Sequence, residues 1–255
     1  MRRLGKNIHG YQGEQIDIQS ILEELKDAAM RTGWRPDHFS ITPKIELLAY
    51  HRASAQPQKN VYISTGIHGD EPAGPLALLK LIQENRWPQD VDLWLCPCLN
   101  LTGFPLNRRE NVNGVDLNRD YRHLMTDEVK THVAWLRQKP QFDVALCLHE
   151  DWEANGFYLY ELNPDQRPSL AEKIIRHVSG VCPIEPGPKV DDWPVQGGIV
   201  RPDVSPEDRP QWPEAIFLVS HKTRQRYTFE TPSDFPLSMR VNAQMAGVQA
   251  VLESI

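Results

Sequence analysis

Hydrophobic positions recur along the chain with two different spacings, one typical of helices and one typical of strands. Five segments carry apolar residues every three to four positions, as amphipathic helices do: 18–30, 72–84, 127–137, 169–178 and 234–255. Thr126 and Ser233 stand where helix N-caps are expected. Alternating, β-branched or uninterrupted apolar runs predict strands at 45–51, 61–65, 91–99, 142–148, 156–162, 215–219 and 226–230.

The order of these elements predicts the architecture. A strand, a helix and a second strand follow one another across residues 61–99, which favours parallel pairing through a right-handed crossover. We expect an α/β fold: a single domain over residues 1–255, with a mixed, mostly parallel twisted sheet and helices on both faces. Residues 1–20 form a polar lead-in to that domain, and the chain shows no internal repeat and no linker.

Two long segments carry neither spacing. Residues 100–122 are polar with few apolar anchors, and a loop of this length inside a compact domain is usually functional or disordered. Residues 183–213 are rich in proline, so we expect an ordered loop without regular elements that could wall a pocket. Trp193 and Trp212 in this region could line the pocket, pack on the core or form an interface.

Composition and charge narrow the function classes. Hydrophobic residues make up 40% and charged residues 24% of the chain, as in ordinary globular proteins. A net charge of −6 with scattered Lys and Arg gives no footprint for nucleic acid, and no apolar run reaches the roughly 18 residues of a membrane span. The N-terminus lacks the apolar stretch of a signal peptide, and the four cysteines form no disulfide framework. We therefore expect a cytoplasmic protein with reduced cysteines and no nucleic-acid or membrane partner.

Three predicted strands end in residues that can bind a metal or move a proton. His68 and Glu71 follow the strand at 61–65, His149 follows the buried run 142–148, and Glu230 ends the last strand. A His-x-x-Glu pair alone is more often a solvated loop. A second histidine at the end of another buried strand raises the expectation of a site, because ligands bind outside the carboxyl ends of strands in α/β sheets. Two histidines with one glutamate are the donor set of catalytic zinc.

The polar loop adds Arg109, Asp116, Asn118 and Arg119. One interpretation is an exposed loop whose arginines form surface ion pairs. The other is a substrate site in which Asn118 and Arg119 grip a carboxylate, since guanidinium binds carboxylate through two hydrogen bonds. Arg109 could then stabilise a developing oxyanion.

The ordered set of motifs resembles the carboxypeptidase A-like zinc metallocarboxypeptidases. It consists of H-G-D-E at 68–71, V-D-L-N-R at 115–119, L-H-E at 148–150 and F-E-T at 229–231, and the likeness runs from about residue 45 to the C-terminus. The resemblance implies one zinc ion held by His68, Glu71 and His149. It also implies a catalytic carboxylate at Glu230 that accepts the proton of the attacking water.

The same resemblance assigns the polar loop. It implies that Asn118 and Arg119 grip the terminal carboxylate of the substrate, that Arg109 stabilises the oxyanion, and that Asp116 orients a zinc-binding histidine. The digestive enzymes of the family carry a tyrosine roughly twenty residues before the catalytic glutamate, and this chain has none there. The chain is more similar to the compact bacterial branch that contains murein-peptide amidases.

We therefore expect a zinc-dependent metallocarboxypeptidase that hydrolyses an amide bond next to a free carboxylate in a peptide or murein-type peptide. An N-acyl amino acid deacylase of the aspartoacylase or succinylglutamate desuccinylase type is the first alternative, with a small acyl-amino-acid substrate. Those relatives carry a further β-rich domain after the glutamate, whereas only 25 residues follow Glu230 here. The second alternative is a non-catalytic metal- or peptide-binding module. The oligomeric state does not follow from the sequence.

Overall fold

The computed structural model describes residues 3–7, 11, 13–42, 45–203 and 205–255. Its helices are α1 (Ile18–Arg31), α2 (Ala73–Glu84), α3 (Asp127–Arg137), α4 (Ala171–Val178), α5 (Glu214–His221) and α6 (Leu237–Leu252). Its strands are β1 (Arg35–Pro36), β2 (Phe39–Thr42), β3 (Ile45–Leu47), β4 (Tyr50–Arg52), β5 (Lys59–Thr65), β6 (Val91–Cys96), β7 (Val144–Asp151), β8 (Tyr158–Leu162), β9 (Lys189–Val190), β10 (Trp193–Gln196), β11 (Ile199–Val200) and β12 (Arg226–Pro232).

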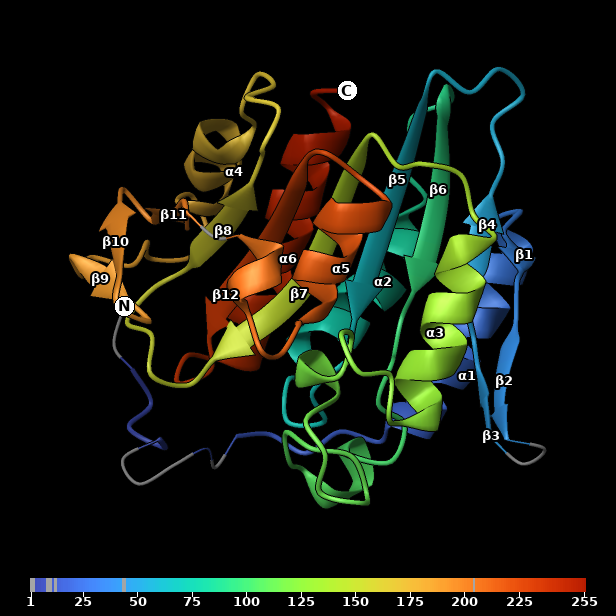
Figure 1. Ribbon diagram of the computed structural model, residues 1–255, viewed down its shortest axis with the longest axis horizontal. Coiled ribbons are helices and arrows are strands. Elements are labelled where there is room, and N and C mark those ends of the chain that lie inside the picture. Colours follow the sequence, from blue (N-terminus) through green and yellow to red (C-terminus); the bar gives the residue numbers. More distant parts are fainter. Residues whose placement is uncertain (1–2, 8–10, 12, 43–44, 204) are drawn as a thin grey trace.

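The main sheet contains ten strands in the order β1-β4-β6-β5-β7-β12-β8-β11-β10-β9 (Figure 1). Its centre is parallel: β6, β5, β7 and β12 run in one direction, and antiparallel strands flank them. The register pairs Thr65 with Leu148 and His149 with Glu230. The carboxyl ends of β5, β7 and β12 therefore meet at one edge of the sheet. The predicted α/β fold with a mixed sheet is confirmed.

Side-chain alternation along the central strands builds a hydrophobic core on each face of the sheet. Ile63 and Leu146 point to the face covered by α1, α2, α4 and α6. Tyr62, one position before Ile63, and Cys147, one position after Leu146, point to the face covered by α3 and α5. Figure 1 shows α3 and α5 in front of the sheet and α2 and α6 behind it. The same alternation sends His149 to the α5 side and Glu150 to the α6 side.

The Pro-rich segment 183–213 does form regular structure, so the expectation of a loop without elements was wrong. It contains β9, β10 and β11, and β11 extends the main sheet by pairing in parallel with β8. Residues with positive φ make the tight turns between these strands: Asp191 and Asp192 at 48° and 65°, and Gly197 and Gly198 at 57° and 80°. Proline is tolerated because these short strands lie at the sheet edge, where a missing N–H breaks little of the ladder.

The apolar run 215–219 lies in helix α5, so the strand predicted there was wrong. A run of five apolar residues fits a buried strand and a buried helix equally well. Pro213 precedes the helix and Glu214 occupies its first turn, which are features of a helix start.

Several element boundaries also differ from the expectation. The strand predicted at 45–51 is two strands, because β3 pairs with β2 in a separate small sheet while β4 joins the main sheet. The last helix begins at Leu237 after Pro236, so Ser233 is not its N-cap. His149 lies within β7 rather than after it.

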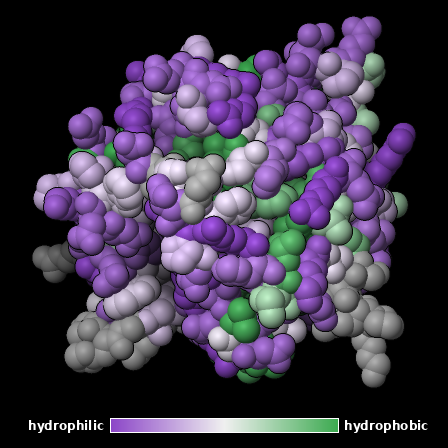
Figure 2. Space-filling view, in the orientation of Figure 1, coloured by the Kyte–Doolittle hydropathy of each residue, from purple (hydrophilic) through white to green (hydrophobic). Residues whose placement is uncertain are grey.

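The helices are amphipathic or buried within this protein. None of the helices in the described residues is long and apolar enough to cross a membrane. Figure 2, in the orientation of Figure 1, shows a face covered mostly by hydrophilic residues, with hydrophobic residues visible in small areas between them.

Candidate active site

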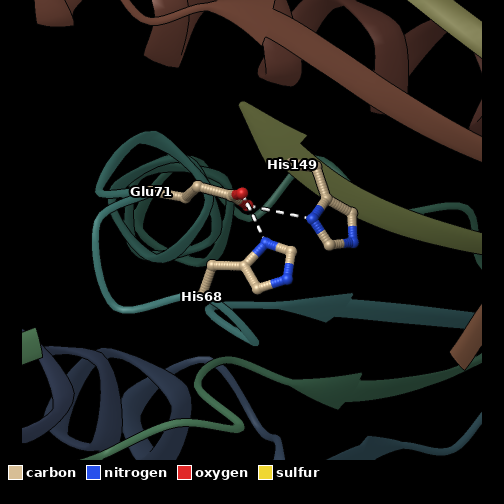
Figure 3. A group of neighbouring side chains, drawn as sticks. All are labelled: His68, Glu71 and His149. Carbon is tan, nitrogen blue, oxygen red and sulfur yellow. Dashed lines mark hydrogen bonds and ion pairs between the residues drawn. The ribbon is translucent and has the colours of Figure 1, made fainter. Parts of the chain in front are cut away.

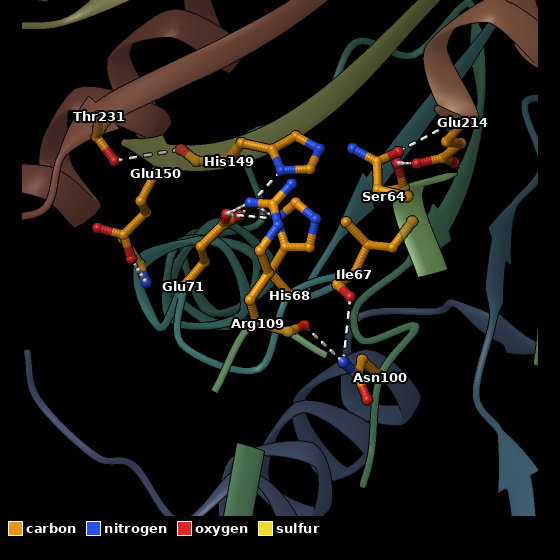
Figure 4. Close-up of polar contacts among 12 residues, drawn as sticks. Ser64, Ile67, His68, Glu71, Asn100, Arg109, His149, Glu150, Glu214 and Thr231 are labelled. Carbon is orange, nitrogen blue, oxygen red and sulfur yellow. Dashed lines mark hydrogen bonds and ion pairs between the residues drawn. The ribbon is translucent and has the colours of Figure 1, made fainter. Parts of the chain in front are cut away.

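The turn after β5 is built on two glycines that place His68 and Glu71. Gly66 has a φ of +63°, a conformation that L side chains rarely adopt. A Cβ on Gly69 would lie 2.2 Å from the carbonyl carbon of Gly103, so only glycine allows the two segments to touch. The Asn100 side-chain amide donates to the carbonyl oxygens of Ile67 and Arg109, both at 3.2 Å (Figure 4). The 66–71 turn is thus held against the 100–110 loop.

His68, Glu71 and His149 converge in the structure (Figure 3). One carboxylate oxygen of Glu71 lies 2.5 Å from His68 Nδ1, and the other lies 2.9 Å from His149 Nδ1. One candidate ligand atom from each residue lies within 4.8 Å of the other two. All three side chains are buried, with residue exposures of 2%, 5% and 4% respectively.

The three buried groups set one another's charge. Burial alone would raise the pKa of Glu71, but the two imidazoles outweigh burial and lower it. Burial lowers the pKa of His68, yet Glu71 and Asp116 outweigh that effect and leave it above its ordinary value. Burial prevails at His149, whose pKa is lowered despite Glu71. Glu71 is therefore a carboxylate at neutral pH, and His149 keeps a neutral imidazole, the form that can donate a lone pair to a metal.

Asp116 links His68 to Arg109. Its Oδ1 lies 3.3 Å from His68 Nε2, and its Oδ2 accepts a 2.8 Å hydrogen bond from Arg109 Nε. Arg109 Nη1 lies 3.3 Å from His68 Nδ1 and 3.9 Å from Glu71 Oε1. A carboxylate behind a histidine fixes the ring and raises its basicity. The guanidinium of Arg109 lies beside the cluster, where a developing negative charge would feel it.

Asn118 and Arg119 form a single 3₁₀ turn that Asp116 begins. The Asp116 side chain accepts from the backbone N–H of Asn118 at 2.8 Å, which caps the turn. Asn118 is 9% exposed, and its Oδ1 accepts from the backbone N–H of Glu214 at 2.8 Å. Arg119 is exposed and donates to the Asn118 carbonyl oxygen at 2.8 Å.

All seven predicted site residues line one cavity of about 810 Å³. Glu230 enters it from β12, on the same face as His149, with which it is paired in the register. Burial, followed by the charges of Glu71 and Asp151, raises the pKa of Glu230 well above its ordinary value. The structure thus brings the predicted residues together, while their roles stay predictions.

Glu150 forms a buried hydrogen bond and a buried ion pair next to the site. It accepts from the backbone N–H of Ala73 at 2.7 Å and forms an ion pair with Arg240 of α6, where both side chains are 0% exposed. Arg240 also pairs with Glu14. This buried network joins the end of β7 to the start of α2 and so to Glu71.

Several residues around the cavity were missed from the sequence. Tyr158 and Tyr160 of β8 and Arg226 of β12 line it, and Glu214 anchors Asn118 from below. Arg226 could have been found, because it stands four residues before Glu230 on a predicted strand and so faces the same side. The tyrosines and Glu214 could not, since they reach the site through β8 pairing and through the unpredicted helix α5.

The donor chemistry of the cluster fits a zinc-type ion. Two imidazole nitrogens and a carboxylate oxygen are the donors of catalytic zinc sites, and here they converge from the turn after β5 and from β7. Burying two imidazoles around one carboxylate is a costly arrangement that a cation between them would stabilise.

Comparisons with known proteins agree with this geometry. The sequence profile of the succinylglutamate desuccinylase/aspartoacylase catalytic domain matches residues 57–181. That range contains the cluster and the Asn118–Arg119 turn and ends before Glu230. Carboxypeptidase SOL1 of Arabidopsis thaliana is 36% identical over 104 residues, which is 32% of this chain and 21% of that protein. The match thus spans about a fifth of the length of this relative.

Solved structures extend the likeness to nearly the whole fold. A candidate metallopeptidase from Shewanella baltica is 26% identical with a TM-score of 0.79, covering 93% of this chain and 92% of that one. One from Shewanella amazonensis is 24% identical with a TM-score of 0.79 and 93% coverage of both chains. The chain resembles the zinc carboxypeptidase-like proteins in sequence and in fold.

A more distant neighbour shares the fold alone. It is a metallo-carboxypeptidase from Pseudomonas aeruginosa in complex with (2-guanidinoethylmercapto)succinic acid, 16% identical with a TM-score of 0.70. It covers 94% of this chain, and this chain covers 69% of it. Together, these likenesses support a hydrolase of the metallopeptidase type and confirm the resemblance that the motifs predicted.

Proposed function

We propose that this protein is a zinc-dependent carboxypeptidase that hydrolyses the amide bond next to a free carboxylate. The observation that carries the proposal is the shared cavity: one wall holds His68, Glu71 and His149, another holds Glu230, and the rim holds Arg119. Metal ligands, a proton acceptor and a carboxylate-binding cation therefore face the same space.

Arg119 and Asn118, at the edge of the cavity, bind and position the substrate. Arg119 offers a guanidinium to the terminal carboxylate, and Asn118, anchored by the backbone of Glu214, is held in the cavity wall beside it. Because the cavity is about 810 Å³, it accommodates the last residues of a peptide. Binding of the terminal carboxylate determines which amide carbonyl lies beside the metal ligands. This positioning lowers the activation barrier for hydrolysis.

Glu230 moves the proton. His68, Glu71 and His149 would hold the zinc ion, which would supply Lewis acidity to a carbonyl oxygen and to water. Glu230 accepts a proton from the attacking water and returns it to the nitrogen of the leaving amine. Arg109, fixed by Asp116 at 2.8 Å, stabilises the negative charge that develops on the carbonyl oxygen.

A second candidate is an N-acyl amino acid deacylase. The match to the succinylglutamate desuccinylase/aspartoacylase catalytic domain favours it, because that profile covers the metal cluster and the Asn118–Arg119 turn. The chemistry at the metal is the same in both cases. The two candidates differ in what occupies the acyl side of the bond, a peptide in one and a small acyl group in the other.

Amino-acid release from three substrate sets tests the proposal. The sets are peptides with a free C-terminus, including a murein tripeptide, the same peptides with an amidated C-terminus, and N-acyl amino acids. We expect release from the free peptides, loss with a chelator, recovery with zinc, and little release from the amidated peptides. Cleavage of N-acyl amino acids alone would select the deacylase, and cleavage of none after zinc loading would refute hydrolysis.

A further inference from the structure

Strand β12 carries a second charged residue into the cavity. Arg226, Thr228 and Glu230 alternate along the strand and all line the cavity, whereas Tyr227 and Phe229 between them pack in the opposite core. At a rise of about 3.3 Å per residue, the Cα atoms of Arg226 and Glu230 lie about 13 Å apart. Arg226 therefore lies deep in the cavity, away from the metal cluster.

Two donor nitrogens of the buried Arg226 guanidinium have no hydrogen-bond partner. The residue is 2% exposed, and within the described part of the chain neither its Nε nor its Nη2 has a hydrogen-bond partner. The nearby carboxylate of Glu214 already accepts from the hydroxyls of Tyr62 and Ser64, both at 2.9 Å. A buried guanidinium with open donors is unfavourable unless a ligand fills them.

Arg240 provides an internal comparison. It is also fully buried, and it donates to the Phe235 carbonyl oxygen and pairs with Glu150 and Glu14. A structural arginine in this protein thus has its donors occupied by protein oxygens. Arg226 differs in facing the cavity with donors that the described residues leave open.

Two acidic groups of the cavity are already engaged. Asp151 accepts from the hydroxyl of Tyr158 at 2.9 Å, and Asp191 accepts from the hydroxyl of Tyr160 at 2.7 Å. Neither of these carboxylates fills the open donors of Arg226, and a ligand carboxylate would complement them. Guanidinium binds a carboxylate through two parallel hydrogen bonds.

We propose that Arg226 is a specificity residue that binds the side-chain carboxylate of an acidic terminal residue. The inference rests on the proposed function, in which Arg119 takes the main-chain carboxylate at the rim. The terminal residue then places its side chain along β12, past Thr228, towards Arg226. The substrate class is a peptide that ends in glutamate or aspartate.

The test compares matched peptides that end in Glu or Gln, and in Asp or Asn, with the zinc-loaded protein. We expect a preference of about 10²-fold or more in kcat/KM for at least one acid over its amide, expressed mainly in KM. Arg226→Met should reduce the preference to within a few-fold, and Arg226→Lys should restore part of it. Arg224→Met is the matched control, since Arg224 is exposed and paired with Asp165; it should keep the preference.

The outcomes separate this inference from the proposed function. Terminal-residue release without preference for either acid, or a preference that persists in Arg226→Met, would refute the role of Arg226 while leaving the carboxypeptidase intact. If no peptide is cleaved, calorimetry with free glutamate and glutamine decides. Tighter binding of glutamate that depends on Arg226 would support the acid pocket without the peptidase, and equal or absent binding would refute both.

Discussion

His132 should make the protein lose stability on mild acidification. It is 1% exposed, and its two ring nitrogens lie 2.9 Å from the hydroxyl of Tyr62 and 2.7 Å from that of Tyr121. Because Tyr62 donates its proton to Glu214, His132 Nε2 donates to Tyr62 and Nδ1 accepts from Tyr121. The neutral ring thus bonds to both hydroxyls, and a second ring proton would place a positive charge in the buried core.

The size of the effect follows from the pKa of this histidine. Burial lowers the pKa of His132 from 6.5 to about 3. Between these values only the unfolded chain takes up the proton, so the free energy of unfolding falls as the pH falls through 6.5 and continues to fall towards 3. From pH 7 to pH 5 this one group costs about 2 kcal/mol, since each pH unit is worth about 1.4 kcal/mol.

Urea unfolding at pH 7, 6 and 5 measures this loss in the parent, in His132→Gln and in His132→Phe. Each variant also loses packing and hydrogen bonds, but that loss is the same at every pH and cancels in the pH dependence. Both variants should therefore lose about 2 kcal/mol less than the parent between pH 7 and pH 5. An equal loss in parent and variants would refute the coupling at His132.

Three further predictions concern the site and its support. Glu230→Gln should lower kcat by about 10²–10⁴-fold while the bound zinc is unchanged, as measured by steady-state kinetics and metal analysis. Arg119→Met should raise KM for peptides with a free C-terminus, and should narrow the gap between free and amidated peptides, because the rim no longer reads the carboxylate. Arg240→Met should cost about 3–5 kcal/mol in urea unfolding because it leaves Glu150 buried without its counter-charge.

Much of the fold could be predicted because its central strands and long helices carry strong patterns. The ends of β5, β7 and β12 follow from runs of apolar residues, and the parallel register then aligns those ends. That alignment brings His68, His149 and Glu230 together although 162 positions separate the first and last in the chain. Motifs placed at strand ends were therefore predictable as a group.

The remaining features depend on context that a local pattern does not contain. The run 215–219 is equally compatible with a strand and a helix, and only packing against β12 makes it α5. Glu214, at the start of that helix, could not be connected to Asn118 without it. The short strands within 183–213 are held by pairing and by residues with positive φ, neither of which proline content predicts.

In the proposed function, His68, Glu71 and His149 hold one zinc ion on which hydrolysis depends. Metal analysis of the purified parent, His149→Gln and Glu230→Gln after equilibration with zinc tests it most directly. We expect about one zinc per chain in the parent and in Glu230→Gln, and close to none in His149→Gln. Equal zinc in the parent and His149→Gln, or none in the parent, would contradict it.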